Sequence, residues 1–276
     1  MAKITVATLK ERKQRKTPIT MLTSYDYAMA RMVDNAGIDM ILVGDSLGNV
    51  VLGYESTIPV TVDDMIHHAK AVCRGVNQAM VVVDMPFMSY QISVVDALRN
   101  AGRIMKESGA QAVKVEGGKE IIEVVRAMVD AGIPVVGHLG LTPQSIHQLG
   151  GFKVQGKDME TAQKMIDDAK LLADAGVCAL VLECVPEKLA QKITDTIHVP
   201  TIGIGAGNVC DGQVLVVNDM LGMYSDFTPK FVKKFADLSK LMQEAIEEYK
   251  QEVINREFPA KEHTFTMSDE VLEKLY

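Results

Sequence analysis

The chain has 276 residues, 47% of them hydrophobic and 24% charged, which is typical of a globular protein with a sizeable core and excludes a disordered or fibrous chain. Its 29 basic and 36 acidic residues give a formal net charge of −7. A net acidic chain lacks the sequence-independent attraction to phosphate that drives most nucleic-acid binding, so we expect no nucleic-acid partner.

The sequence carries no signal for secretion or for a membrane span. The basic segment 1–17 is not followed by the apolar region of a signal peptide, and we interpret it as a solvated segment. No run of ~18 apolar residues without a charge occurs, so we expect no contact with a membrane. The four cysteines form no Cys-x-x-Cys pair, which favours a reducing, cytoplasmic location.

Short aliphatic or β-branched runs alternate with amphipathic windows along the chain, the pattern of β-α units around a parallel sheet. The predicted strands are 19–23, 40–44, 80–83, 112–115, 134–137, 179–182, 200–204 and 214–217. The predicted helices include 25–36, 62–76, 94–107, 119–130, 159–175 and 231–251. Four of the strands follow a glycine that suits the end of a helix, at positions 37, 109, 132 and 176.

No linker, charge block or change of composition divides the chain into two halves. We therefore expect the α/β class and a single (β/α)8 TIM barrel: one domain over residues 1–276, with a C-terminal extension at about 255–276. An open, doubly wound sheet is the alternative fold. The loops 47–59 and 137–158 contain several Gly and Pro residues and are long for β-α loops, which is typical of functional loops.

Polar residues end five consecutive predicted strands. They are Asp45, Asp84, Glu116, His138 and Glu183. In a parallel barrel these strand ends converge on one face, where active sites are assembled. Strand alternation also turns Lys114 to the same inward side as Glu116, and a charge buried there is costly unless it is paired or coordinated. The strand ends therefore predict an active site. Cys184 would face the helices, on the wrong side to act as a nucleophile.

Three of these acids, Asp45, Asp84 and Glu116, would repel one another strongly if all were ionised without a cation. A metal ion resolves the repulsion, and oxygen ligands select a hard ion, with Mg²⁺ as the default. Zinc is disfavoured because no pairs of Cys and His lie nearby. The glycine-rich run 203–207 lacks the spacing of a dinucleotide fingerprint, and we interpret it as a tight turn that approaches a ligand.

With their flanks, these residues closely resemble the ketopantoate hydroxymethyltransferase family almost from end to end. The matching motifs are Leu22-Thr23-Ser24-Tyr25-Asp26, Val43-Gly44-Asp45-Ser46-Leu47-Gly48, the stretch 53–68, Asp84-Met85-Pro86-Phe87, Val113-Lys114-Val115-Glu116-Gly117-Gly118, the stretch 137–144 from Gly137-His138 to Pro143-Gln144, Leu182-Glu183-Cys184-Val185-Pro186, and the run 203–207 followed by Asp211-Gly212-Gln213. So many motifs in one order make the resemblance highly specific.

The resemblance implies a barrel of the phosphoenolpyruvate/pyruvate superfamily and a cytoplasmic, Mg²⁺-dependent enzyme of pantothenate and coenzyme A biosynthesis. The family transfers a hydroxymethyl group from 5,10-methylenetetrahydrofolate to 3-methyl-2-oxobutanoate, which gives 2-dehydropantoate. The implied partners are thus a small 2-oxo acid and a folate. The resemblance also implies a homo-oligomer, a homodecamer of paired pentamers, with one Mg²⁺ per subunit.

The mechanism that follows assigns a role to each strand-end residue. Mg²⁺ on Asp45, Asp84 and Glu116 chelates the keto and carboxylate oxygens of the substrate and stabilises the forming enolate, so Asp45 and Asp84 also contribute to substrate binding. Ser46 and Lys114 bind a substrate oxygen, and His138 hydrogen-bonds the substrate or a ligand. Glu183 accepts the C3 proton.

Two other functions compete with this one. A 2-oxo-acid lyase or mutase of the same superfamily would share the enolate, but the chain has no Lys-Lys-Cys-Gly-His-type loop with a catalytic thiol. A non-catalytic metabolite-binding barrel would tolerate the loss of Glu183, because an inward charge would then serve no ligand.

Overall fold

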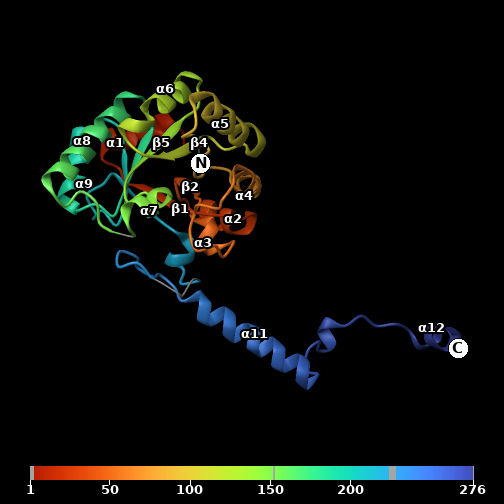
Figure 1. Cartoon of the computed structure of the whole chain (residues 1–276). Coiled ribbons are helices and arrows are strands. Elements are labelled where there is room, and N and C mark those ends of the chain that lie inside the picture. Colours follow the sequence, from red (N-terminus) through yellow and green to blue (C-terminus); the bar gives the residue numbers. More distant parts are fainter. Residues whose placement is uncertain (1–2, 152, 224–227, 276) are drawn as a thin grey trace.

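The computed structural model describes residues 3–151, 153–223 and 228–275 (Figure 1). The predicted segments 1–17, 137–158 and 255–276 each include positions outside these ranges. At the centre lies a closed barrel of parallel strands in the order β1 to β8. The strands are β1 (Ile19–Thr23), β2 (Met40–Val43), β3 (Met80–Asp84), β4 (Ala112–Glu116), β5 (Val135–Gly140), β6 (Ala179–Glu183), β7 (Thr201–Ile204) and β8 (Gly212–Leu215). Every predicted strand overlaps an observed one, and the predicted TIM barrel is confirmed over the open sheet.

Helices surround the barrel, and most lie where the amphipathic windows predict them (Figure 1). The longer ones are α2 (Tyr27–Asn35), α4 (Val62–Gly75), α5 (Val94–Ser108), α6 (Ile122–Asp130), α8 (Met159–Asp174) and α9 (Glu187–Thr196). The glycines that follow four of them all have a positive φ, as expected for helix ends. Within the described ranges, no helix has both the length and the apolar character needed to cross a membrane.

The two loops singled out in the sequence contain short helices. The first holds α3 (Leu47–Val50), and the second holds η2 (Pro143–Ser145) and α7 (Ile146–Leu149). The second loop also begins later than predicted, because β5 continues to Gly140. The remaining short helices are η1 (Lys119–Ile121), α10 (Val217–Met220), η3 (Lys261–His263), α12 (Asp269–Leu272) and η4 (Glu273–Leu275).

Strand alternation divides the core into two parts. Side chains such as Met40, Met80 and Ile202 fill the inside of the barrel. The residues at the alternate positions along the strands, such as Val113 and Leu180, point outward and pack with the helices. This alternation places Lys114 and Glu116 on the inner side of β4, as predicted.

The prediction of a solvated basic segment is only partly right. Lys10, Arg15 and Lys16 are exposed, but Arg12 and Lys13 are half-buried in ion pairs. Val6–Arg15 forms helix α1, whose Leu9 is fully buried with the side chains inside the barrel. The guanidinium of Arg12 lies 2.6 Å from a carboxylate oxygen of Asp39, and Lys13 Nζ lies 2.7 Å from Asp211. Because both acids precede strands, α1 closes the amino-terminal end of the barrel.

The last long helix leaves the barrel. Helix α11 (Leu238–Asn255) projects away from the other helices in Figure 1 and buries none of its residues. It starts seven residues later than the predicted window 231–251. Its exposed side carries large apolar side chains, namely Leu241, Met242, Ile246, Tyr249 and Val253. Such a row of apolar residues is the pattern of a helix that packs on a partner.

The ends of strands β5 and β6 approach each other closely at Gly140. Its φ is +98°, and a Cβ added there would lie 2.1 Å from the carbonyl oxygen of Glu183. The same carbonyl accepts a hydrogen bond of 2.8 Å from the backbone N–H of Leu141. Only glycine allows this approach, which fixes the backbone that carries Glu183.

Gly140→Ala is therefore expected to destabilise the barrel more than a change at another glycine with positive φ. Gly132 is the matched control, because its φ is +82° but nothing lies within 4 Å of an added Cβ. Both variants incur about 1–2 kcal/mol of backbone strain. Gly140→Ala adds about 1–3 kcal/mol for the overlap. Urea unfolding monitored by circular dichroism measures the difference, and equal losses in the two variants would contradict this account.

Candidate active site

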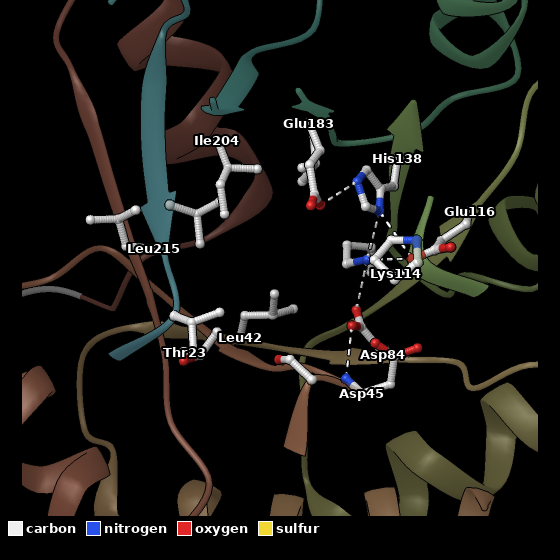
Figure 2. Close-up of a pocket in the computed structure, with 15 residues that line it drawn as sticks. Thr23, Leu42, Asp45, Asp84, Lys114, Glu116, His138, Glu183, Ile204 and Leu215 are labelled. Atoms are coloured by element: carbon white, nitrogen blue, oxygen red, sulfur yellow. Dashed lines mark hydrogen bonds and ion pairs between the residues drawn. The ribbon is translucent and has the colours of Figure 1, made fainter. Parts of the chain in front are cut away.

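A cavity of about 100 Å³ lies at the carboxyl ends of the barrel strands (Figure 2). Its polar lining contains every site residue predicted from the sequence, namely Asp45, Ser46, Asp84, Lys114, Glu116, His138 and Glu183. Leu42, Val181, Ile204 and Val214 form an apolar wall. The structure thus brings together residues from β2, β3, β4, β5 and β6.

Lys114 lies in the middle of the charged cluster. It is 4% exposed, and its Nζ lies 3.1 Å from Asp84 Oδ1, 3.1 Å from His138 Nδ1 and 3.9 Å from Glu116 Oε1. Burial alone would lower the pKa of Lys114, but the charges of Asp84, Glu116 and Asp45 raise it above its usual value. The side chain is therefore a fixed positive charge at the site.

Asp45 and Asp84 are adjacent and buried. The backbone N–H of Asp45 donates a hydrogen bond of 3.0 Å to Asp84 Oδ2. Burial raises the pKa of Asp45 well above its ordinary value, and the charges of Asp84 and Glu116 raise it further. Burial also raises the pKa of Asp84, although Lys114 opposes the shift. The two acids therefore need more positive charge than Lys114 supplies.

His138 lies between two carboxylates (Figure 2), although its Nε2 makes no well-directed hydrogen bond within the described ranges. Its Nδ1 lies 3.2 Å from Glu116 Oε1, and its Nε2 lies 3.1 Å from Glu183 Oε2. Burial and Lys114 would lower the pKa of His138, but the two carboxylates raise it overall. The pKa of Glu116 is lowered, because His138 and Lys114 outweigh the effect of its burial. Glu116 is thus held in its ionised form.

Glu183 differs from the other acids in its exposure. Its side chain is 16% exposed, compared with 4% for Asp84 and 3% for Glu116. It points toward the cavity from the end of β6, with His138 beside it (Figure 2). A carboxylate in this position can exchange a proton with a small molecule in the cavity.

Ser46 is held by a residue that the strand-end pattern did not single out. Its Oγ lies 2.8 Å from the hydroxyl of Tyr25, which is itself buried. The carbonyl of Tyr25 is in turn 2.7 Å from His68 Nδ1. Tyr25 lies within one of the motifs that match the family, so the sequence did mark it as a candidate. It precedes α2 rather than ending a strand, and the strand-end rule gave it no role.

A second group that the strand-end pattern missed supports the acids from behind. Gln144, in η2, donates from Nε2 to Asp45 Oδ2 at 2.8 Å, and its backbone N–H donates to Glu116 Oε2 at 3.0 Å. Tyr90, after β3, lies 2.9 Å from Gln144 Oε1 through its hydroxyl. Gln144 ends another matched motif, but no feature of the sequence marks Tyr90.

The glycine-rich run behaves differently from the prediction. Only Ile204 of this run lines the cavity. An added Cβ at Gly205 would meet the ring of Phe231, and one at Gly207 would meet Glu187. These two close approaches are to other parts of the protein, and an approach of the turn to a ligand stays a prediction. Cys184 is not among the cavity-lining residues, in agreement with the prediction.

The donor set suits a hard divalent cation. Four carboxylates and Lys114 leave a charge of −3 if His138 is neutral and −2 if it is protonated. Asp84 Oδ1 is buried and makes no well-directed hydrogen bond within the described ranges, and it lies 3.1 Å from the Lys114 ammonium, so this oxygen already faces a positive charge. In those ranges, as the side chains stand, no three Asp, Glu, His or Cys residues converge closely enough to hold a metal ion. Mg²⁺ ligation by Asp45, Asp84 and Glu116 stays a prediction.

Solved structures of low sequence identity share the fold. A phosphonopyruvate hydrolase in complex with oxalate and Mg²⁺ has a TM-score of 0.62 and 11% identity, and the match covers 99% of this chain and 94% of that one. A 2,3-dimethylmalate lyase, a member of the PEP mutase/isocitrate lyase superfamily, has a TM-score of 0.62 and 17% identity over 96% of this chain and 92% of the other. These likenesses show the barrel fold alone.

The sequence comparisons are far more specific. The model of the family described as ketopantoate hydroxymethyltransferase matches residues 3–261. A 3-methyl-2-oxobutanoate hydroxymethyltransferase of Syntrophomonas wolfei is 63% identical over 276 residues, which is the whole of both chains. One from Carboxydothermus hydrogenoformans is 62% identical, again over both entire chains. These matches confirm the predicted enzyme family over a lyase, a mutase or a non-catalytic barrel. The chain belongs to the ketopantoate hydroxymethyltransferase family.

Proposed function

We propose that this chain transfers a hydroxymethyl group from 5,10-methylenetetrahydrofolate to 3-methyl-2-oxobutanoate through an enolate, with Mg²⁺ as cofactor. The product is 2-dehydropantoate, and the step belongs to pantothenate biosynthesis. The observation that carries the proposal is the arrangement of the cavity, where the partly exposed Glu183 faces a buried acid cluster around Lys114. This arrangement suits proton removal beside a ketone.

The cavity suits a small branched 2-oxo acid. Lys114, Ser46 and His138 provide hydrogen-bond donors for its carboxylate and keto oxygens. The apolar wall, which includes Leu42 and Val181, suits its isopropyl group. Bound Mg²⁺, held by Asp45, Asp84 and Glu116, would supply Lewis-acid stabilisation of the negative charge that develops on the keto oxygen.

In this mechanism Glu183 accepts the proton from C3 of the oxo acid. His138, whose Nε2 lies 3.1 Å from Glu183 Oε2, orients that carboxylate. The Lys114 ammonium stabilises the oxygen on which the enolate charge develops. C3 then forms a bond to the methylene carbon carried by the folate, after one of the two C–N bonds of that carbon has broken and the released nitrogen has taken a proton. Water replaces the second nitrogen at the same carbon, which gives the hydroxymethylated product and tetrahydrofolate.

We place this activity in the cytoplasm, where 2-oxo acids and folates serve as substrates. All four cysteines are free, which suits a reducing compartment. The net charge of −7 supports small-molecule partners rather than nucleic acid.

We also propose that the chain forms a homo-oligomer, by family resemblance a homodecamer of paired pentamers. Its residues 1–276 would form one barrel domain with an extension from about 255. The apolar side of α11 supports self-association, because side chains such as Ile246 and Tyr249 are 65% and 58% exposed. A second copy of this chain would remove that apolar surface from water.

Proton exchange at C3 tests the proposed chemistry. Proton NMR of 3-methyl-2-oxobutanoate in D₂O is expected to show Mg²⁺-dependent loss of the C3 proton with the wild-type enzyme, and formation of product once methylenetetrahydrofolate is added. Glu183→Gln should slow the exchange by roughly 10²–10⁴-fold, because it removes the base. Binding of the oxo acid in the presence of Mg²⁺ should persist in this variant.

Glu187→Gln is the matched control. Glu187 is an exposed carboxylate in the first turn of α9, outside the cavity, and its loss should leave the exchange unchanged. Wild-type exchange rates in Glu183→Gln would overturn the assignment of the base. If neither exchange nor product is observed with both substrates and Mg²⁺ present, that result would overturn the proposed function itself.

Sedimentation velocity tests the proposed self-association. The wild-type protein is expected to sediment as a species several times larger than its 30.2 kDa chain. The double substitution Ile246→Glu and Tyr249→Glu should shift it toward smaller species, because two charges would be buried in the contact. Gln251→Glu, on the other side of α11, should change nothing. A wild-type monomer would contradict the proposal.

A further inference from the structure

Gln144 is a buried amide whose hydrogen bonds are all made to the site or its support. It is 4% exposed and lies in η2, the short helix that follows β5. Its Nε2 donates to Asp45 Oδ2 at 2.8 Å and to the carbonyl of Met85 at 2.9 Å. Its Oε1 accepts from the hydroxyl of Tyr90 at 2.9 Å. The two protons of the amide nitrogen are thus both used.

Chemistry permits only one orientation of this amide. Rotation by 180° would turn Oε1 toward the Asp45 carboxylate and the Met85 carbonyl, both of which are acceptors. It would also leave Nε2 facing Tyr90. The donor to Asp45 is therefore fixed by three neighbours, one that follows β2 and two that follow β3.

The backbone of the same residue holds a second acid. The Gln144 N–H donates to Glu116 Oε2 at 3.0 Å, while Glu116 Oε1 lies 3.2 Å from His138 Nδ1. Both oxygens of Glu116 thus have a partner from the protein. One residue of the β5 loop therefore contacts acids from the ends of β2 and β4.

Tyr90 completes the support. It is fully buried, and its hydroxyl accepts a hydrogen bond of 3.0 Å from the backbone N–H of Glu116. The same hydroxyl lies 2.9 Å from Gln144 Oε1 and 3.1 Å from the Glu116 carbonyl, the two acceptors that share its proton. Tyr90 thereby ties the amide of Gln144 to the backbone of β4.

This arrangement decides which oxygen of Asp45 faces the cavity. Oδ2 is taken by Gln144, whereas Oδ1 makes no hydrogen bond within the described ranges. Gln144 itself does not line the cavity, although the neighbouring Pro143 does. The amide therefore acts on the site through Asp45 and Glu116 and not through contact with a substrate.

We propose that Gln144, anchored by Tyr90, is a positioning residue that orients Asp45 so that Oδ1 is presented to the cation and the oxo acid. This inference rests on the proposed function, because it presumes that the acids bind a divalent cation. Groups that hydrogen-bond to metal ligands typically change metal affinity or activity by about 10–100-fold when they are removed.

Electron paramagnetic resonance can measure Mn²⁺ binding to the substrate-free protein. This measurement tests the proposal without relying on turnover. Gln144→Met keeps the length of the side chain and removes both donors to Asp45 and Met85. It is expected to weaken Mn²⁺ binding by roughly 10–100-fold. In turnover assays the loss should be recovered largely at saturating Mg²⁺, which a general loss of structure would not allow.

Gln163→Met is the matched control. Its amide lies on the exposed surface of α8 and donates to Asp167 Oδ1 at 3.0 Å, outside the cavity, so its loss should leave Mn²⁺ affinity unchanged. If Gln144→Met does not fold, Tyr90→Phe carries the test, because it removes the hydroxyl that holds Oε1 and should weaken Mn²⁺ binding in the same direction.

The outcomes separate the two proposals. Wild-type protein that binds no Mn²⁺ would overturn the proposed cation site and, with it, this inference. Wild-type protein that binds Mn²⁺, with unchanged affinity in Gln144→Met or in a folded Tyr90→Phe, would overturn the role of Gln144 and leave the cation site standing.

Discussion

The arrangement of the whole site depends on one buried ammonium group, that of Lys114, at the carboxyl end of the barrel. Lys114 Nζ is held 3.1 Å from Asp84 Oδ1, and an isolated charge at such depth would be very costly. The register of adjacent strands brings its partners into position. Asp84 on β3 lies opposite Lys114 on β4, and Glu116 on β4 lies opposite His138 on β5. A slip of one residue in β4 would turn Lys114 toward the helices and leave these acids without it. The charges therefore require this register, and the closed barrel provides it.

The two ends of the barrel serve different purposes. At the amino-terminal end, α1 covers the strand starts, and its Arg12 and Lys13 form ion pairs with Asp39 and Asp211. At the carboxyl end the charges are acidic in excess, and they line a cavity instead of pairing completely. Ion pairs thus stabilise the amino-terminal end. At the carboxyl end, the incompletely paired acids suit a cationic or polar ligand. Gly140 belongs to the second end, since its missing side chain lets β5 support the backbone of Glu183.

Periodicity predicted the fold, and strand ends predicted which polar residues meet at the cavity, because a parallel barrel converts position along a strand directly into position in space. Contacts that depend on the path of a loop were not predictable in this way. Gln144 reaches Asp45 across 99 positions, and nothing local in η2 indicates that contact. The basic run in α1 was misjudged for a similar reason, because the acids that pair with it lie far along the chain. In α11 the apolar pattern was visible in the sequence, but the helix buries none of its residues within the described ranges.

The proposed division of labour between Glu116 and Glu183 follows from their hydrogen bonds. Glu116 has a partner for each oxygen, and its neighbours hold its pKa low, so it gains little by accepting a proton. Within the described ranges Glu183 has the ring of His138 as its one ion-pair partner, and it is the most exposed acid of the cluster. Because the carboxylates raise the pKa of His138, its ring can carry a positive charge beside Glu183. A base must be accessible to the substrate proton, and among the cavity acids Glu183 is the most exposed.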